Sequence, residues 1–171
     1  MKKQLYWIIP LSSIFLFFVV YAVYTLNDNN PSDFERVITK NQELTFSSLE
    51  GENVAIESIV RSSDFTLVYT WASWCPFCAE DLVYLDEIAA TNTNLQILAL
   101  NRKESTHQAN RFLSTIGPLD NITILIDSND NYYKEIDGFS MPEGVLYNSE
   151  GSVVSHIRGS IRNVDILDFI K

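Results

Sequence analysis

The feature that most constrains this chain is a pair of cysteines, Cys75 and Cys78, with Pro76 and Phe77 between them. They are the only two cysteines in 171 residues, so the chain cannot build a scaffold of several disulfides. A bond between them would close a very small loop, which removes little entropy from the unfolded chain and adds little stability. The pair therefore indicates redox chemistry rather than a stabilising cross-link.

The two cysteines lie where a strand pattern meets a helix pattern. Residues 65–71 are rich in aromatic and β-branched side chains, which is typical of a buried strand. Proline is favoured at the first position of a helix, so a helix is expected to start near Pro76. Its apolar face would carry Leu82, Leu85, Ile88 and Ala89.

This placement predicts an acidic thiol at Cys75. A cysteine at a helix start faces unpaired N–H groups and the positive end of the helix dipole. Both favour the thiolate, so the pKa of Cys75 is expected to fall from about 8.5 to between about 3.5 and 7.5. Cys78, one turn further in, would be sheltered and would resolve a mixed disulfide on Cys75. Trp74 would cover one side of the pair and limit the access of water.

Three other interpretations of the cysteines compete with redox chemistry. A zinc site needs four ligands, and the only histidines, His107 and His156, lie far apart without ligand spacing. The pair could also be two inert core cysteines, or a purely structural disulfide. All three are weaker than redox chemistry for a Cys-x-x-Cys motif between an aromatic strand and a helix start.

The remaining pattern predicts an α/β fold with a mixed central sheet flanked by helices. Further strands are expected at 95–100 and 122–126, with hairpins at 44–46 with 54–56 and at 144–147 with 153–156. Helices are expected from a Ser105 cap to about residue 116, at 132–136, and at the end, where Ile166, Leu167 and Ile170 are apolar.

The N-terminal segment predicts a membrane anchor. The run from Leu5 to Leu26 holds no charged residue, and about 22 helical residues span about 33 Å, enough to cross a bilayer core. Lys2 and Lys3 favour a cytoplasmic stub at residues 1–4, so the linker at 27–43 and the domain at 44–171 would lie outside. We therefore expect a single-pass protein of the cell (inner) membrane. A cleaved signal peptide is the alternative.

The charge balance argues against one class of partner. The net charge is −10, and the twelve basic residues are scattered rather than clustered. Binding to nucleic acid needs clustered lysine and arginine, so no nucleic-acid partner is expected.

The stretch from Trp71 to Asp81, WASWCPFCAED, resembles the active site of extracytoplasmic thioredoxin-like proteins of the TlpA/ResA group and of CcmG, also called DsbE. Residues 100–104 and the segment IDGFSMPE at 136–143 also resemble CcmG-like members, the latter their cis-proline loop. The resemblance runs from about Leu44 to the C-terminus. It implies a thioredoxin-like fold for that part of the chain.

The resemblance also implies roles for further residues. Pro142 would form a cis bond and pack opposite Cys75, and the backbone of Met141 would pair with an extended substrate. Asp81, three residues after Cys78, and Glu143, beside the loop, are candidate carboxylates with raised pKa values that would accept the proton of Cys78. The alternative for Asp81 and its neighbour Glu80 is simply a favourable charge at a helix N-terminus.

Three positions depart from the pattern. Tyr69 stands where thioredoxin has a buried aspartate, Val83 where this helix often has a kinking proline, and Gly144 where a threonine is common. The first change moves the role of proton acceptor toward Asp81 or Glu143. The others leave the specificity for partners open.

The resemblance implies a reductase without cofactor or metal. It would receive electrons from a membrane electron-donor protein and reduce a disulfide-bearing exported protein such as an apocytochrome c. The alternatives are an oxidant or isomerase of the same fold, because sequence does not fix redox direction, or a non-enzymatic metal-binding module.

Overall fold

The computed structural model describes residues 17–19, 21 and 44–171. The chain divides into two units, residues 1–33 and residues 34–171. In the first unit, Phe17, Phe18, Val19 and Tyr21 are helical. The rest of the predicted anchor from Leu5 to Leu26, the stub and the linker lie outside the described residues. Among the residues that are described, no helix combines the length and the hydrophobicity of a membrane span.

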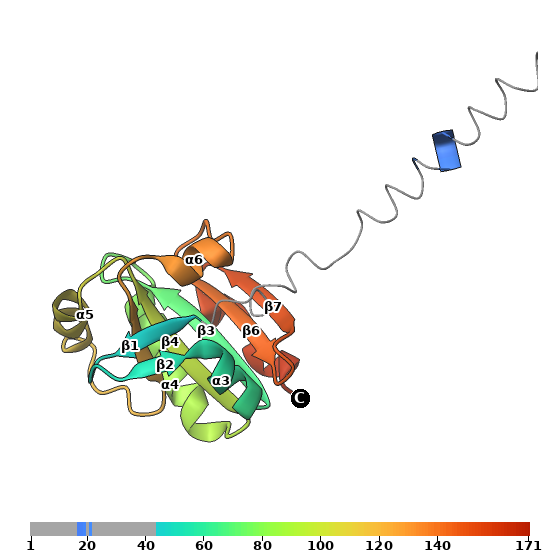
Figure 1. Ribbon diagram of the computed structural model, residues 1–171. Helices are drawn as coiled ribbons and strands as arrows, with labels where there is room; N and C mark the ends of the chain where they lie inside the picture. Colours follow the sequence, from blue (N-terminus) through green and yellow to red (C-terminus); the bar gives the residue numbers. More distant parts are fainter. Residues whose placement is uncertain (1–16, 20, 22–43) are drawn as a thin grey trace, which may run out of the picture. The chain divides into compact units, whose positions relative to one another are not determined.

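The second unit is built on a seven-stranded mixed sheet in the order β2-β1-β5-β4-β3-β6-β7 (Figure 1). Strands β3, β4 and β5 run parallel, and the remaining pairs are antiparallel. The strands are β1 (Thr45–Ser48), β2 (Asn53–Ala55), β3 (Phe65–Trp71), β4 (Leu95–Arg102), β5 (Thr123–Asp127), β6 (Glu143–Asn148) and β7 (Val153–Arg158). The mixed sheet predicted from the sequence is therefore confirmed.

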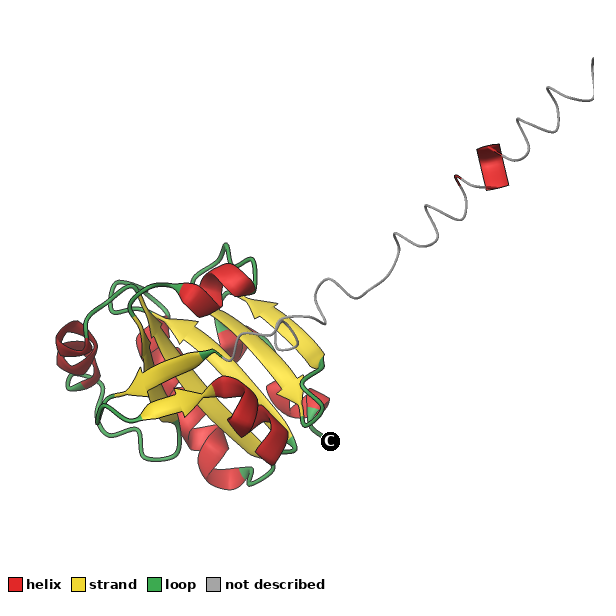
Figure 2. Cartoon of the chain, in the orientation of Figure 1, coloured by secondary structure: helices red, strands yellow, loops and turns green. Residues whose placement is uncertain are grey.

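Helices cover both faces of this sheet (Figure 2). They are α3 (Ile56–Ser62), α4 (Cys78–Thr91), α5 (Thr106–Leu113) and α6 (Asn131–Glu135), followed by the 3₁₀ turns η1 (Ile161–Asn163) and η2 (Ile166–Phe169). The predicted cap of α5 is confirmed. Ser105 and Gln108 form a reciprocal capping box, in which each side chain bonds the backbone N–H of the other residue.

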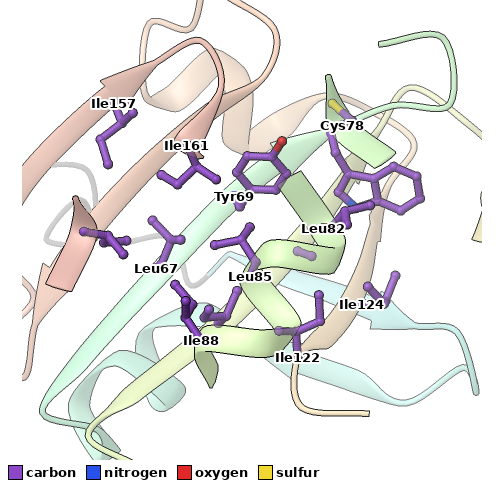
Figure 3. Packing of buried hydrophobic residues seen from close by; sticks show 14 of the residues in the cluster. Leu67, Tyr69, Cys78, Leu82, Leu85, Ile88, Ile122, Ile124, Ile157 and Ile161 are labelled. Carbon is purple, nitrogen blue, oxygen red and sulfur yellow. The ribbon is translucent and has the colours of Figure 1, made fainter. Parts of the chain in front are cut away.

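Alternation along the strands creates two hydrophobic clusters, one on each face. On β3, Leu67, Tyr69 and Trp71 join the cluster that packs against α4, α5, η1 and η2, and Val68 joins the other, with α3 and α6. Figure 3 shows the first cluster, in which Leu82 and Leu85 of α4 lie over the sheet. Cys75 and Cys78 belong to this cluster, so the redox pair is part of the packed core of the domain.

Two predicted elements were wrong, and the start of a third lies two residues from the expected position. Ile56, predicted to end a strand, instead begins α3, a helix whose N-cap, Ala55, makes no side-chain capping bond that would signal a start. The helix expected near Pro76 begins at Cys78, because residues 76 and 77 form a turn. The closing helix is two 3₁₀ turns rather than one α-helix.

Candidate active site

Cys75 and Cys78 are joined by a disulfide, with their Cα atoms 5.5 Å apart. Cys75 lies in the turn between β3 and α4, where its N–H donates to Ala72 O (3.1 Å) and its carbonyl accepts from Cys78 N (3.4 Å). The Cys75 residue is 4% exposed and Cys78 is 0% exposed. Only Cys75 of the pair therefore keeps any exposed surface, and Cys78 is fully covered.

Exposed apolar side chains surround the pair in sequence. Trp74 is 61% exposed and Phe77 is also exposed, as is Pro76. Trp74 was predicted to cover the cysteines, but most of its surface faces solvent. It therefore offers an apolar contact surface next to Cys75, of the kind that aromatic residues provide at protein interfaces.

A buried carboxylate fixes the start of the active-site turn. Glu104 accepts hydrogen bonds from the backbone N–H of Ser73 (2.9 Å), from its hydroxyl (2.5 Å) and from Asn101 Nδ2 (2.8 Å). Glu104 is only 5% exposed. Glu104 falls within residues 100–104, the stretch that resembles CcmG-like proteins, but its role was not predicted. Nothing in the local pattern pairs it with Ser73, 31 positions away.

Asp81 is fully buried and accepts four hydrogen bonds. The donors are Tyr69 Oη (2.8 Å), Ser160 Oγ (2.6 Å), Ile161 N (3.1 Å) and Arg162 Nε (3.2 Å). Burial, and then the charge of Asp81, raise the pKa of Tyr69 far above its usual range. The Tyr69 hydroxyl therefore stays protonated and donates a hydrogen bond to Asp81. The carboxylate ties α4 to β3 and to the C-terminal segment.

The bond between Met141 and Pro142 is cis, as predicted. Strand register aligns Thr70 of β3 with Glu143 of β6, and the Thr70 hydroxyl donates to Glu143 O (2.8 Å). Pro142 therefore lies beside the end of β3, the strand that leads into the cysteines. Met141 is partly buried and packs against both hydrophobic clusters, one of which holds Cys75.

The prediction of a raised pKa for Glu143 was wrong. Burial does push its pKa upward, but a hydrogen bond from His156, the Ser140 amide and the charges of His156 and Arg158 overcome that effect and lower the pKa. The distances are 2.6 Å from Oε1 to His156 Nε2 and 3.1 Å from Oε1 to Arg158 Nε. These donors come from β7, which the sequence pattern did not pair with this carboxylate.

Neither histidine lies near a set of metal ligands. Within residues 17–19, 21 and 44–171, no group of three or more His, Cys, Asp or Glu side chains is arranged to hold a metal ion. His107 contacts Arg111 on α5, and His156 contacts Glu143.

Residues 29–168, most of the chain, match the Redoxin family. The thiol:disulfide interchange protein DsbE of Vibrio cholerae is 26% identical over 157 residues, which cover 89% of this chain and 83% of that protein. The thiol:disulfide interchange protein CycY of Rhizobium leguminosarum is 31% identical over 113 residues, which cover 66% of this chain and 59% of that protein.

The fold has solved counterparts. The structure of a secreted Mycobacterium tuberculosis disulfide oxidoreductase homologous to E. coli DsbE aligns with a TM-score of 0.60 at 20% identity, covering 70% of this chain and 85% of that one. This likeness shows the thioredoxin-like α/β fold. The chain therefore belongs to the Redoxin family, in its TlpA, ResA and DsbE group, and is a thiol–disulfide oxidoreductase.

Proposed function

We propose that this oxidoreductase works as a reductase on exported proteins, with the disulfide of an apocytochrome c before haem attachment as its substrate. The observation that carries the proposal is the asymmetry of the pair, in which Cys75 keeps 4% of its surface exposed and Cys78 keeps none. Such an arrangement suits a dithiol that attacks with one sulfur and resolves with the other.

In the first step, the Cys75 thiolate attacks one sulfur of the substrate disulfide. A bond forms between Cys75 Sγ and that sulfur, the substrate S–S bond breaks, and the other substrate sulfur leaves as a thiolate. The backbone of Met141, held by cis Pro142, pairs with the extended substrate chain during this step. The exposed face of Trp74 adds apolar contact, and Pro76 sets the turn between the two cysteines.

In the second step, Cys78 loses its proton and attacks Cys75 Sγ. The Cys75–Cys78 disulfide forms, and the second substrate sulfur leaves as a thiolate, so that two electrons have passed from the dithiol to the substrate. The disulfide in the structure corresponds to this oxidised end state. A membrane electron-donor protein returns two electrons to the pair.

We assign the proton of Cys78 to Asp81, which follows it by three residues on α4 and so shares its side of the helix. Two of the four donors to Asp81 are the hydroxyls of Tyr69 and Ser160. A hydroxyl can accept as well as donate, so either one could accept a hydrogen bond from the protonated carboxyl group. Glu143 has a lowered pKa, which disfavours it as a proton acceptor.

The apolar run from Leu5 to Leu26, preceded by Lys2 and Lys3, supports a single-pass anchor in the cell membrane with the redox domain outside. Protease added to intact spheroplasts should then digest the domain at residues 44–171. Protection of the domain until lysis would overturn this topology.

A trapping experiment tests the substrate. Replacing Cys78→Ser removes the resolving sulfur, so Cys75 should stay joined to its target, and mass spectrometry should identify an apocytochrome c. The matched control is Cys75→Ser, which should trap nothing. Capture of other exported proteins alone would overturn the assignment to apocytochrome c. A reduction potential of about −120 mV would overturn the reductase direction.

A further inference from the structure

The segment just before the cis proline, residues 138–141, is named here the pairing loop, because its last residue presents the backbone proposed above to pair with substrate. The amide and carbonyl of Met141 make no hydrogen bond within the described part of the chain. They are thus open to a substrate strand. The position of these two groups depends on the contacts that hold residues 138–140.

Tyr133 of α6 holds the pairing loop at two points. Its hydroxyl donates to Ser140 O (2.8 Å), and its own carbonyl accepts from Gly138 N (2.9 Å). The ring also lies against Gly138 so closely that a Cβ added there would come within 2.5–2.7 Å of three ring atoms. The Tyr133 residue is 8% exposed, so these contacts belong to the packed interior rather than to the surface.

Tyr133 is itself fixed from the end of β4. The guanidinium of Arg102 lies over its ring, 3.5 Å from the centroid. Arg102 in turn donates to both carboxylate oxygens of Asp130, through Nε (2.7 Å) and Nη2 (2.6 Å). A two-pronged ion pair of this kind fixes the plane of the guanidinium, and with it the ring that the guanidinium covers.

The Glu143 carboxylate holds the pairing loop through two of the loop's backbone N–H groups. Its Oε2 accepts from the N–H of Phe139 and of Ser140, both at 3.2 Å. Its Oε1 is held on β7 by His156 and Arg158, and Arg158 also lies over the Phe139 ring, 4.6 Å from the centroid. Gly138, Phe139 and Ser140 are therefore all held from outside the loop. Within the described part of the chain, Met141 is the one loop residue whose backbone N–H and carbonyl both lack a partner.

We infer that Tyr133 is a positioning residue for the oxidoreductase reaction, which sets affinity for peptide disulfides by fixing the pairing loop and does not act on the dithiol. The inference rests on the proposed pairing of Met141 with substrate. A peptide disulfide uses this loop, whereas a small aromatic disulfide needs only Cys75. The two kinds of substrate should therefore respond differently when the loop is loosened.

The test compares wild type with Tyr133→Phe, using the reduced full chain in detergent in single turnover. The substrates are a short peptide with one internal disulfide and 5,5′-dithiobis(2-nitrobenzoate). The variant loses the bond to Ser140 O but keeps the ring, so the half-saturating peptide concentration should rise by about three- to tenfold. The limiting rate, the rate with the small disulfide and the reduction potential should stay unchanged.

Tyr132→Phe is the matched control, because Tyr132 is the adjacent residue of α6 and its hydroxyl bonds that of Tyr147 (2.9 Å) instead of the pairing loop. It should leave the half-saturating peptide concentration unchanged. As a second variant, Arg102→Lys removes the guanidinium from the Tyr133 ring and should raise that concentration in the same direction as Tyr133→Phe.

The outcomes distinguish failure of the inference about Tyr133 from failure of the proposed function. A Tyr133→Phe protein with wild-type peptide saturation overturns the inference, and so does an equal loss of rate with both disulfides. A wild-type protein that reacts with the small disulfide but with no peptide overturns the proposed pairing at Met141. Failure of the reduced wild type with both substrates overturns the proposed reductase function as a whole.

Discussion

The hydroxyl of Tyr69 donates a hydrogen bond to the carboxylate of Asp81 across 2.8 Å, and both side chains are completely buried. The bond joins the strand that leads into the cysteines to the helix that follows them. Tyr69 and Cys78 lie in the same hydrophobic cluster, which Figure 3 shows from close by. A carboxylate in such surroundings is stable only while its donors stay in place, because an unpaired buried charge is very costly.

Replacing Tyr69→Phe should therefore destabilise the domain. The change removes one of four donors from Asp81 and leaves the ring, so the free energy of unfolding should fall by about 1–3 kcal/mol. Urea unfolding of the oxidised protein at pH 7 measures it. Tyr84→Phe is the control, because the Tyr84 hydroxyl has no hydrogen-bond partner within the described residues. It should change stability by less than about 0.5 kcal/mol.

A double-mutant cycle separates the hydrogen-bond network from simple packing. Ser160→Ala removes a second donor from the same carboxylate (2.6 Å). If Tyr69 and Ser160 stabilise one charge, their effects should not add, with a coupling of about 0.5–3 kcal/mol. Additive effects would show that each residue acts through its own packing, and that Asp81 does not depend on them together.

The lowered pKa of Glu143 should make the free energy of unfolding depend on pH in the acid range. Its pKa in the folded protein is lowered from the ordinary 4.5, since the donors from His156, Ser140 and Arg158 outweigh the burial that raises it. A lowered pKa contributes stability that is present above the unfolded value and is lost as the pH falls through the folded value. Glu143→Gln cannot titrate. Its deficit relative to wild type, about 3–5 kcal/mol at neutral pH, should shrink below pH 4.5.

The measurement is urea unfolding of both proteins between about pH 3 and pH 7, the range in which carboxylates titrate. Glu57→Gln serves as the control, because Glu57 makes an exposed pair with Arg61 one helical turn away. Such a pair contributes about 0.3–0.5 kcal/mol, so its pH profile should stay close to that of wild type. Parallel profiles for Glu143→Gln and wild type would contradict the lowered pKa.

Much of the fold was predictable, because the burial of a strand or helix is visible in the pattern of apolar residues within that segment. Strands β3, β4 and β5 are largely apolar runs because their residues are buried on both faces of the sheet. The Ser105 cap is a purely local signal. Helix α3 was missed for the converse reason. Its seven residues carry no capping side chain, and its helical form depends on burying Ile56 and Val60 against the sheet.

The site was predictable only in part. Cys75, Cys78, Pro142, Asp81 and Glu143 each stand in a recognisable local motif. Their partners do not, because sheet pairing and chain crossing bring those partners in from far along the sequence. Ser160 is 79 positions from Asp81, and His156 reaches Glu143 only because β6 and β7 form a hairpin. The predicted direction of the Glu143 pKa shift was wrong because the actual direction depends on those long-range donors.

Gly138→Ala should weaken the pairing loop by a steric route. The new Cβ would fall 2.5–2.7 Å from the Tyr133 ring, so the ring or the loop must move, at a cost of about 1–3 kcal/mol in unfolding free energy. The half-saturating concentration of a peptide disulfide should also rise. Gly51→Ala is the control: its φ of +87° makes alanine strained, at about 1–2 kcal/mol, but the space around it is open.

The two glycine variants should thus be similarly destabilised and differ in reactivity. Gly51 lies in the β1–β2 turn, and a Cβ added there would meet no atom within 4 Å, so it would not contact the pairing loop. Equal peptide saturation in the two variants would mean that general loss of stability, rather than the contact with Tyr133, governs the reaction.

Alkylation of the reduced protein tests the acidity of Cys75. The first turn of α4 lies just beyond Cys75 and favours a thiolate, whereas Glu80 and Asp81 in that turn oppose it. Arg162 forms ion pairs with both carboxylates and so offsets part of their charge. We expect the helix start to favour the Cys75 thiolate, and Cys78 should resist iodoacetamide at every pH because it is fully covered.

Mass spectrometry after iodoacetamide pulses at varied pH gives the rate at each cysteine, and the same protein in urea supplies the unperturbed reference. Arg162→Gln should raise the pKa of Cys75, since it leaves the two carboxylates uncompensated. A Cys75 that titrates in the folded protein as it does in urea would mean that the helix start does not activate it. The attack of Cys75 on a substrate disulfide would then need a different source of thiolate.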